Sequence, residues 1–239
     1  MLGAARRAAL EGLGFFFPRT CGVCGRDLPS EADPLCALCV GAFPRWAGFS
    51  CRVCGIPLPD GGARCDACRR SRRSFRFCRS GGLYDGPLRE ALLRLKYGAR
   101  EALARPLGRW LALRWRERPE LGKVDVVTAV PLHFLRRHAR GYNQSERLAR
   151  SFAAAVGLPY LEVLRRTRWT RPQTRLGRDA RRENVAEAFR VALPESVAGK
   201  RFLLIDDVCT TGATLDAAAG ALRRAGARWV AALTAARQT

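Results

Sequence analysis

Hydrophobic positions form short apolar runs and longer stretches of helical spacing, and the two alternate from about residue 80 onward. The runs predict strands at 81–84, 124–131, 158–161, 185–191, 201–207 and 229–234. The helical spacing predicts helices at 87–97, 102–117, 145–155 and 215–225. Residues 202–205 are all apolar, which is typical of a parallel strand covered on both faces. The alternation therefore predicts an α/β fold built on a parallel sheet.

Two arginine-rich segments interrupt this pattern. The first follows the strand at 124–131 and runs to Gly141, and the second runs from Leu164 to about Asn184. We expect both to be loops. A long basic loop in a compact domain is either functional or disordered.

The strand at 201–207 ends on two adjacent acids and leads into a segment rich in hydroxyl groups and glycine. Asp206 and Asp207 come first, and after a two-residue spacer the segment contains Thr210, Thr211, Gly212, Ala213 and Thr214. Parallel sheets bind ligands at such strand ends, and a turn that starts a helix favours a phosphate. The acids would repel a phosphate, but they can accept hydrogen bonds from vicinal ribose hydroxyls. The segment therefore predicts a site that holds both ends of a ribose 5-phosphate.

Two other interpretations of this segment compete with a ribose-phosphate site. One is a buried strand with a capped turn and solvated acids, but adjacent buried carboxylates are costly unless something pairs with them. The other is a Walker A loop. Gly199-Lys200 precedes the strand and lacks both the earlier glycine and the following Ser or Thr, which excludes that loop.

Eight of the ten cysteines lie in four C-x-x-C pairs before residue 69, at the spacing of zinc ribbons. We therefore expect two structural zinc ions, bound by Cys21, Cys24, Cys36, Cys39, Cys51, Cys54, Cys65 and Cys68. The stretch 21–29 is repeated at 51–59, but the spacing leaves open whether each ion is bound within one copy or between copies. A disulfide framework is the alternative, and paired C-x-x-C turns favour metal over it.

The cysteine-rich segment has too little aliphatic content to fold without metal. We expect a short N-terminal segment at 1–20, a double zinc ribbon at 21–78 and the α/β domain at 79–239. The sequence contains no run of 18 apolar residues, so we expect no membrane span. The stretch from Leu10 to Phe17 does not have the features of a signal peptide. Thiols in this number favour a reducing compartment, the cytoplasm.

The chain carries a formal net charge of +22, mostly from arginine. A GC-rich genome would explain arginine in place of lysine, but not the excess over acids. The charge therefore predicts a nucleic-acid partner or a polyanionic substrate whose binding weakens with salt.

The acid pair and the Thr210–Thr214 segment resemble the phosphoribosyl-pyrophosphate (PRPP) signature of type I phosphoribosyltransferases. A longer series of motifs resembles the ComF family of bacterial competence proteins over nearly the whole chain. These motifs are the C-x-x-C repeats, Leu95-Lys96-Tyr97-Gly98, Val130-Pro131-Leu132, Arg140-Gly141-Tyr142-Asn143-Gln144, Arg166-Thr167 with Gln173, Asn184 with Ala188-Phe189, and the acidic-pair loop.

The resemblance implies a double zinc ribbon joined to a type I phosphoribosyltransferase-like domain that takes part in uptake or use of transforming DNA. It places catalytic Asp206 and Asp207 on the ribose and residues 210–214 on the 5′-phosphate. It also implies a pyrophosphate and lid group consisting of Lys96, Arg136, Arg137, Arg140, Arg166 and Arg175. The implied partners are PRPP with magnesium, DNA with single strands favoured, and other competence or recombination proteins.

Three functions remain open at this point. The first is pentosyl transfer from PRPP within DNA utilisation, and the second is salvage of a small-molecule base. The third is a catalytically inactive module that binds single-stranded DNA, for which stacking aromatic side chains would be needed. The acceptor substrate and the oligomeric state have no signal in the sequence.

Overall fold

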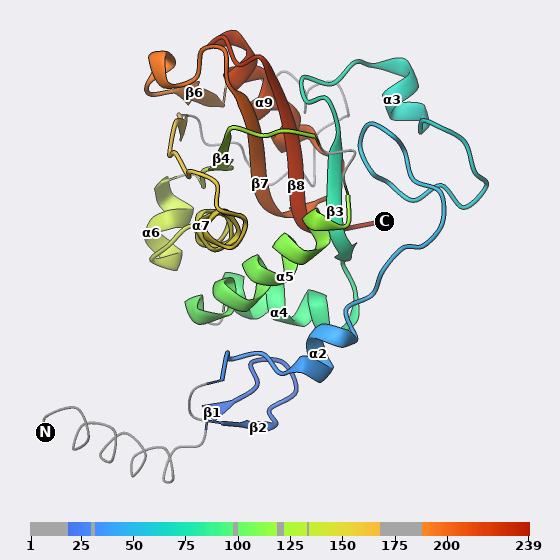
Figure 1. Cartoon of the computed structure of the whole chain (residues 1–239), viewed down its shortest axis with the longest axis vertical. Coiled ribbons are helices and arrows are strands. Elements are labelled where there is room, and N and C mark those ends of the chain that lie inside the picture. The colour runs from blue at the N-terminus through green and yellow to red at the C-terminus, as the bar shows by residue number, and fades with distance from the viewer. Residues whose placement is uncertain (1–18, 30–31, 98–99, 119–121, 133, 168–187) are drawn as a thin grey trace, which may run out of the picture.

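The computed structural model describes residues 19–29, 32–97, 100–118, 122–132, 134–167 and 188–239. Its centre is a four-stranded sheet in the order β3 (Cys78–Leu83), β8 (Trp229–Arg237), β7 (Arg201–Cys209) and β4 (Val126–Ala129) (Figure 1). All neighbouring strands in it are parallel. A further parallel bridge joins Val127 to Tyr160. The parallel α/β fold expected from the sequence is confirmed.

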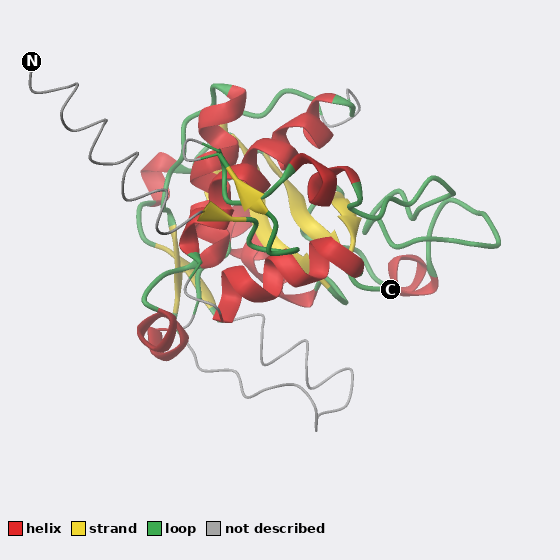
Figure 2. Ribbon diagram, turned by 90° about the horizontal axis from the view of Figure 1, so that it is seen from below, coloured by secondary structure: helices red, strands yellow, loops and turns green. Residues whose placement is uncertain are grey.

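Helices cover both faces of this sheet (Figure 2). On one face lie α4 (Gly86–Tyr97), η1 (Glu101–Leu103), α5 (Ala104–Arg116) and α7 (Gln144–Val156), packed on Val127, Leu203 and Leu233. On the other face lies α9 (Ala213–Arg224), packed on Phe202, Leu204 and Val230. Successive residues of β7 thus enter opposite halves of the core, which explains why its apolar run shows no alternation.

The strands β5 (Leu164–Arg166) and β6 (Phe189–Val191) form a small antiparallel sheet beside α9, and η4 (Pro194–Ser196) follows β6. The expectation of a loop from residue 164 is therefore wrong for β5, where every backbone position pairs with β6. The rest of that expected loop, 168–187, lies outside the described residues.

The expected loop after β4 contains a helix, α6 (Phe134–Arg140). The expectation of a continuous loop there is wrong. The segment has neither glycine nor proline between residues 134 and 140, and leucine, alanine and arginine are good helix formers. Its high arginine content made it look irregular.

The two cysteine-rich copies lie against different parts of the α/β core (Figure 1). The first contains β1 (Arg19–Thr20), β2 (Asp27–Leu28) and α2 (Ala37–Gly41), and its buried residues join the α4 and α5 side of the core. The second contains α3 (Asp66–Arg70) and joins the α9 side. None of the described helices has the combination of length and apolar character that crossing a bilayer requires.

Candidate functional site

The acid pair lies at the C-terminal part of β7, where the buried strand reaches the edge of the sheet. Residues 202–205 are fully buried, and Asp207 is 5% exposed. The Asp206 carboxylate accepts a bond from the Asp207 N–H (2.9 Å), and Asp207 Oδ1 accepts one from the Val208 N–H (2.6 Å). These local bonds fix the direction of both side chains. The acids therefore present a preformed pair of acceptors at the edge where parallel sheets bind ligands.

The first turn of α7 supplies a donor to each acid. Gln144 Nε2 donates to Asp207 Oδ2 at 2.9 Å, and Ser145 Oγ donates to Asp206 Oδ1 at 2.7 Å. Asn143 caps the helix by accepting from the Ser145 N–H, while its amide donates to the Val130 carbonyl at 3.1 Å. These three side chains are buried. They tie the end of β4 to the acid pair on β7.

Lys96, near the end of α4, forms an ion pair with Asp207 at 3.1 Å. Both side chains are largely buried, with 16% and 8% exposed. Burial alone would lower the pKa of Lys96, but the charge of Asp207 and its hydrogen bond outweigh burial and raise that pKa. The structure thus brings Lys96 directly to the acid pair.

Two residues of the Arg140–Gln144 motif connect the end of α4 to the start of α7 beside the acid pair. The hydroxyl of the buried Tyr142 donates to the carbonyl of Leu95, one residue before Lys96. Arg140 donates to Gln144 Oε1 at 3.1 Å, and its guanidinium lies over the ring of Tyr97. The α4 end and the α7 start are therefore held together around the acid pair.

The two acids have an unfavourable electrostatic interaction that Lys96 relieves only in part. Burial and the neighbouring charge of Asp207 raise the pKa of Asp206 to about 7, against the opposing bonds from Ser145 and the Asp207 N–H and the charge of Lys96. A carboxyl group with a pKa near neutrality can exist in either protonation state at working pH. It can therefore accept or donate a hydrogen bond to a ligand hydroxyl.

The segment after the acids forms a turn that starts α9. Thr210 and Thr211 are exposed, and Gly212 adopts a left-handed conformation with φ of 78° at the N-terminus of the helix. Thr211 Oγ1 accepts a bond from the Ala213 N–H at 3.3 Å. The free N–H groups of a helix start and the threonine hydroxyls are suited to an anion. We refer to residues 209–214 below as the phosphate loop.

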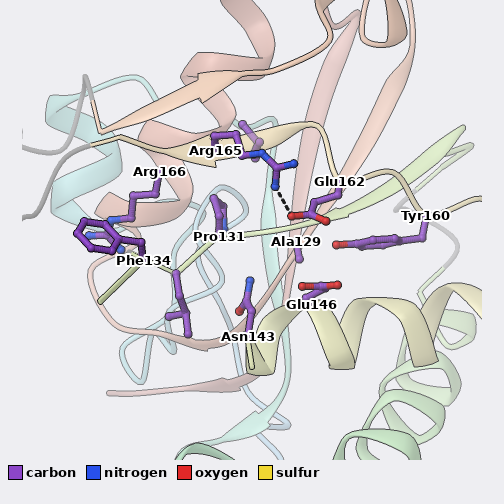
Figure 3. A pocket seen from close by; sticks show the side chains of 11 residues that line it. Ala129, Pro131, Phe134, Asn143, Glu146, Tyr160, Glu162, Arg165 and Arg166 are labelled. Carbon is purple, nitrogen blue, oxygen red and sulfur yellow. Dashed lines mark hydrogen bonds and ion pairs between the residues drawn. The ribbon is translucent and has the colours of Figure 1, made fainter. Parts of the chain in front are cut away.

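The other predicted site residues are placed less completely. Arg166 lines a cavity of about 140 Å³ near the end of β4, bounded also by Asn143 and Phe134. Figure 3 shows Glu146, Glu162 and Tyr160 converging on one side of this cavity. The side chains of Arg136 and Arg137 are outside the described part of the structure, and so is the whole of Arg175. The structure therefore gathers Lys96 and Arg140 at the acid pair and Arg166 at the neighbouring cavity.

Sequence reasoning missed Gln144 and Ser145 as site residues. Gln144 belongs to the Arg140–Gln144 motif that carries the family resemblance, and Ser145 is the first residue of the helix expected at 145–155. Polar residues at a helix start are the ordinary capping pattern, so they gave no separate signal of a site. The contacts of Gln144 and Ser145 with the acids depend on the α7 to β7 packing, which the sequence does not give.

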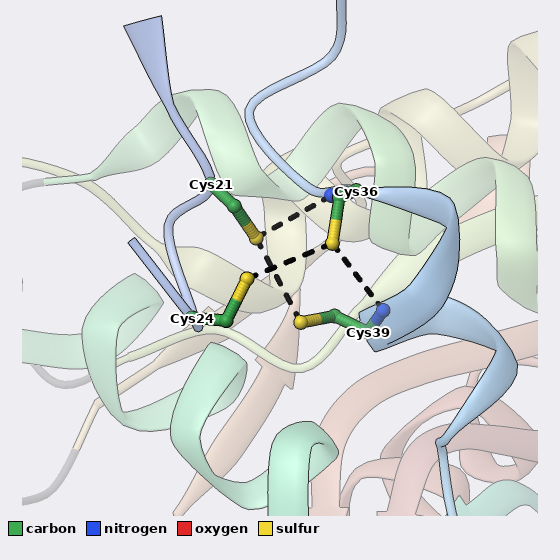
Figure 4. A group of neighbouring side chains, drawn as sticks. All are labelled: Cys21, Cys24, Cys36 and Cys39. Atoms are coloured by element: carbon green, nitrogen blue, oxygen red, sulfur yellow. Dashed lines mark hydrogen bonds between the residues drawn. The ribbon is translucent and has the colours of Figure 1, made fainter. Parts of the chain in front are cut away.

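Eight cysteines form two tetrads, one in each repeat, so the question left open by the spacing is settled in favour of sites within each copy. The sulfurs of Cys21, Cys24, Cys36 and Cys39 lie within 4.8 Å of one another, as do those of Cys51, Cys54, Cys65 and Cys68 (Figure 4 shows the first set). All ten cysteines are free thiols.

The sulfur geometry fits zinc. Four sulfurs placed tetrahedrally at about 2.3 Å from an ion lie about 3.8 Å apart. The Cys21–Cys39 and Cys24–Cys36 sulfur pairs are 3.8 Å apart, and the Cys54–Cys65 pair is 3.6 Å apart. Burial would raise the pKa of Cys21, but backbone N–H donors outweigh it and lower the pKa to about 6, which favours the thiolate that binds metal. The two tetrads therefore fit two structural zinc ions.

Comparisons with known proteins agree with this architecture. A double zinc ribbon domain matches residues 12–69, and a phosphoribosyl transferase domain matches residues 122–239. The DNA utilization protein YhgH of Salmonella typhimurium is 31% identical over 217 residues, which cover 89% of this chain and 94% of that protein. The YhgH protein of Escherichia coli K12 is 31% identical over 214 residues, covering 88% of this chain and 93% of that protein.

Competence protein F of Haemophilus influenzae is 30% identical over 219 residues, covering 88% of this chain and 93% of that protein. These relatives match nearly from end to end, and both domain types are present in the expected order. The chain therefore belongs to the ComF/YhgH family, with a double zinc ribbon followed by a phosphoribosyltransferase domain.

Proposed function

We propose that this protein binds PRPP with Mg²⁺ at the C-terminal edge of its sheet and serves DNA utilisation in the cytoplasm. One observation carries the proposal: two adjacent acids lie near the C-terminal end of a buried strand, each held by a donor from α7, and the strand leads into the phosphate loop. A ribose 5-phosphate has hydroxyls at one end and an anion at the other. The acids suit the first and the loop suits the second.

Each group then has a defined part in binding. Asp206 and Asp207 accept hydrogen bonds from the ribose hydroxyls, and the N–H groups of residues 210–214 hold the 5′-phosphate. We assign the pyrophosphate to Arg140, Arg136 and Arg137, because planar guanidinium groups bind phosphates in pairs of hydrogen bonds. Bound Mg²⁺ would neutralise charge on the pyrophosphate oxygens.

Transfer would form a bond between a nucleophilic acceptor and C1 of the ribose while the C1–O bond to pyrophosphate breaks. Pyrophosphate leaves with the electron pair of that bond, and the acceptor loses its proton. In this proposal Arg140 and Lys96, which lie beside the acid pair, stabilise the negative charge that develops on the leaving group. The acceptor is a base or a related nitrogen nucleophile, and a small base from salvage is the simplest candidate.

The role in DNA utilisation rests on two supports. Relatives over nearly the full length are named for DNA utilisation and competence, and the chain carries a net charge of +22. Exposed aromatic side chains are groups on which the bases of a single strand can stack. They include Trp46, Phe49 and Tyr97. A single strand suits such a surface better than a duplex, whose bases are already stacked.

The test is calorimetric titration of the zinc-loaded protein with PRPP and Mg²⁺. The double variant Asp206→Asn/Asp207→Asn should lose binding while keeping its zinc. Asp60→Asn/Asp85→Asn removes the same charge from two exposed positions and should bind like the wild type. Equal affinity of the wild type and the Asp206/Asp207 variant would refute the assignment. If the wild type binds PRPP and the Asp206/Asp207 variant does not, release of pyrophosphate on adding candidate bases would identify the acceptor.

A DNA-binding module without transfer is the second candidate, favoured by the charge. It predicts binding to single-stranded oligonucleotides that weakens steeply with salt, with a log–log slope of about −0.7 for each phosphate contacted. Fluorescence anisotropy between about 50 and 200 mM salt measures this slope. DNA binding that is unchanged in the Asp206/Asp207 variant, together with no PRPP binding by the wild type, would favour this candidate. Absence of DNA binding at low salt would eliminate it.

A further inference from the structure

The segment that leaves the second cysteine tetrad runs along the back of the phosphate loop. Arg73 donates to the Thr211 carbonyl at 3.3 Å and forms an ion pair with Asp216, in the first turn of α9, at 3.3 Å. The N–H of Ser74 donates to the other oxygen of Asp216 at 2.6 Å. The Arg73 guanidinium also interacts with Cys68, a member of the tetrad: burial would lower the pKa of Arg73, but the charge of Asp216 and the Cys68 side chain raise it. One buried side chain, 8% exposed, thus contacts both the tetrad and the loop.

A second buried arginine makes the same connection from β8. Arg237 is 3% exposed. It donates to the carbonyl of the tetrad residue Cys54 at 3.1 Å and to the sulfur of Cys209, the first residue of the phosphate loop, at 2.7 Å. The next residue, Gln238, donates its N–H to the Cys209 carbonyl at 3.0 Å. The phosphate loop is therefore connected to the second tetrad at Cys209 through Arg237 and at Thr211 through Arg73.

The positive charge of the two arginines favours a negatively charged zinc site beside them. Two buried guanidinium groups are costly unless anions compensate them, and Asp216 compensates only one. Four thiolates around Zn²⁺ carry a net charge of −2. The Nε atoms of Arg73 and Arg237 are buried and have no hydrogen-bond partner among the described residues. The arginines thus have both charge and donors left for a thiolate cluster, and zinc holds the four sulfurs of that cluster in a fixed position beside them.

The first tetrad has different surroundings. Its segment packs on η1 and α5, where Leu103 touches Gly22 and where Arg105 and Arg109 pair with Asp33. Its buried cysteines belong to the α4 and α5 half of the core. The cysteines of the second tetrad cluster instead with Phe75, Cys209 and Leu215. The two tetrads are chemically alike but differ in their access to the phosphate loop.

We propose that zinc in the second tetrad holds the phosphate loop in its binding conformation through Arg73 and Arg237, so that occupancy of this one site controls affinity for the phosphoribosyl ligand. Zinc in the first tetrad supports the α4 and α5 side. This coupling rests on the proposed function for its ligand, PRPP. By linkage, bound PRPP tightens zinc at the second tetrad by the same factor.

The experiment compares Cys65→Ser with Cys24→Ser, each removing a ligand that is not fully buried from one tetrad. Zinc content and affinity for PRPP with Mg²⁺ are measured on the full chain. Both variants should lose about one zinc, and Cys65→Ser should weaken PRPP binding about tenfold or more, as expected for a typical coupling free energy. Cys24→Ser should bind within about twofold of the wild type. Equal losses in the two variants, or none in Cys65→Ser, would overturn the coupling.

Hydrogen exchange separates this inference from the proposed function. Amides of residues 209–216 should exchange faster in Cys65→Ser than in the wild type, and at the wild-type rate in Cys24→Ser, without any ligand present. If the wild type binds no PRPP, the proposed function fails while this comparison still decides the coupling. Unchanged exchange in Cys65→Ser would refute it.

The connecting role of Arg73 has its own test. Arg73→Met removes the charge and leaves all four zinc ligands in place, so it should keep its zinc and weaken PRPP binding. Arg73→Lys retains the charge near Asp216 and should recover part of the affinity. Unchanged affinity in Arg73→Met would show that the loop does not depend on this residue. Zinc loss in Arg73→Met together with full affinity would also contradict the proposal.

Discussion

Asp206 is placed so that its ionisation opposes folding. Its folded pKa of about 7 lies above its ordinary value of 3.8, so its stabilising contribution is complete below about pH 4 and is lost as the pH rises through 7. Asp206→Asn cannot ionise and avoids this loss. We expect the variant to gain Tm relative to the wild type at pH 8, with a smaller gain at pH 5. For a chain of this size, about 1 kcal/mol corresponds to about 2–4 °C.

Thermal unfolding of both proteins at the two pH values measures this difference. A constant offset would mean that the Asp206 carboxyl does not change its protonation state in this range. The same substitution is expected to impair PRPP binding, so the acid is retained at a cost in stability. Such a trade-off is typical of functional sites.

The contribution of the Lys96–Asp207 ion pair to stability should depend on the negative charge of Asp206. Lys96→Met leaves two adjacent carboxylates without their cation, so we expect a loss of stability, whereas Lys123→Met at an exposed position should be nearly neutral. In the Asp206→Asn background the same change should cost less, because one negative charge is already gone. The double-mutant cycle should give a coupling of about 0.5–3 kcal/mol. Additive effects at pH 8 would show that Lys96 does not compensate Asp206.

Sequence patterns identified the residues of this site whose chemistry is local. Asp206 and Asp207 follow a run of apolar residues, and the glycine with φ of 78° lies where a turn was expected. The partners of the acids could not be inferred in the same way. Gln144 and Lys96 are 63 and 111 positions away from Asp207 in the chain, and only the packing of α4, α7 and β7 brings the three together.

The crossing of α5 and α7 depends on a glycine in α5. A Cβ atom on Gly108 would lie 2.5 Å from Ser151 Cβ and 3.0 Å from the Leu148 carbonyl. Gly108→Ala should therefore push α7 outward and destabilise the protein by about 1–3 kcal/mol. Because α7 carries the donors to the acid pair, PRPP affinity should fall as well.

Gly41→Ala is the matched control, since that position lies in helix α2 and has nothing within 4 Å of an added Cβ. It should be neutral or slightly stabilising, because alanine has the higher helix propensity. Chemical denaturation of the two variants measures both changes. If Gly108→Ala were as stable as the wild type, the helices could separate freely and α7 would not be a rigid support for the site.

At the level of elements, periodicity predicted long helices and core strands well, and it failed where charge obscured it. The expected helix at 145–155 corresponds to α7, and the expected strand at 201–207 to the longer β7. Helix α6 was missed because arginine is both a good helix former and a common loop residue. Strand β3 begins three residues earlier than expected, at Cys78, because its first residues pair with β8 instead of forming an apolar run.

At the level of the whole molecule, the sequence indicated two zinc segments but not where they dock. The repeats look alike in their C-x-x-C turns, yet one joins α4 and α5 while the other joins β3, β8 and α9. The difference comes from a few side chains outside the repeated motifs. Phe43 meets Trp110 of α5 in an edge-on contact at 5.0 Å, whereas the Cys78 N–H donates to Val53 at 2.6 Å and ties the second copy to β3.

Zinc removal should therefore act locally. Each structural ion contributes on the order of 10 kcal/mol to the stability of its own site. The strands β7 and β8 pack mainly against helices on both faces of the sheet, and few residues of the zinc segments contact them. Treatment with a strong chelator should release two zinc ions for each chain. It should abolish hydrogen-exchange protection in the cysteine repeats, raise exchange in the phosphate loop and leave the amides of β8 protected. The circular dichroism spectrum of the chelated protein should retain most of its helical signal, because α5, α7 and α9 pack on the faces of the sheet.

Cooperative loss of all secondary structure on chelation would instead mean that the zinc segments and the sheet form one folding unit, with the ribbons needed to complete the core.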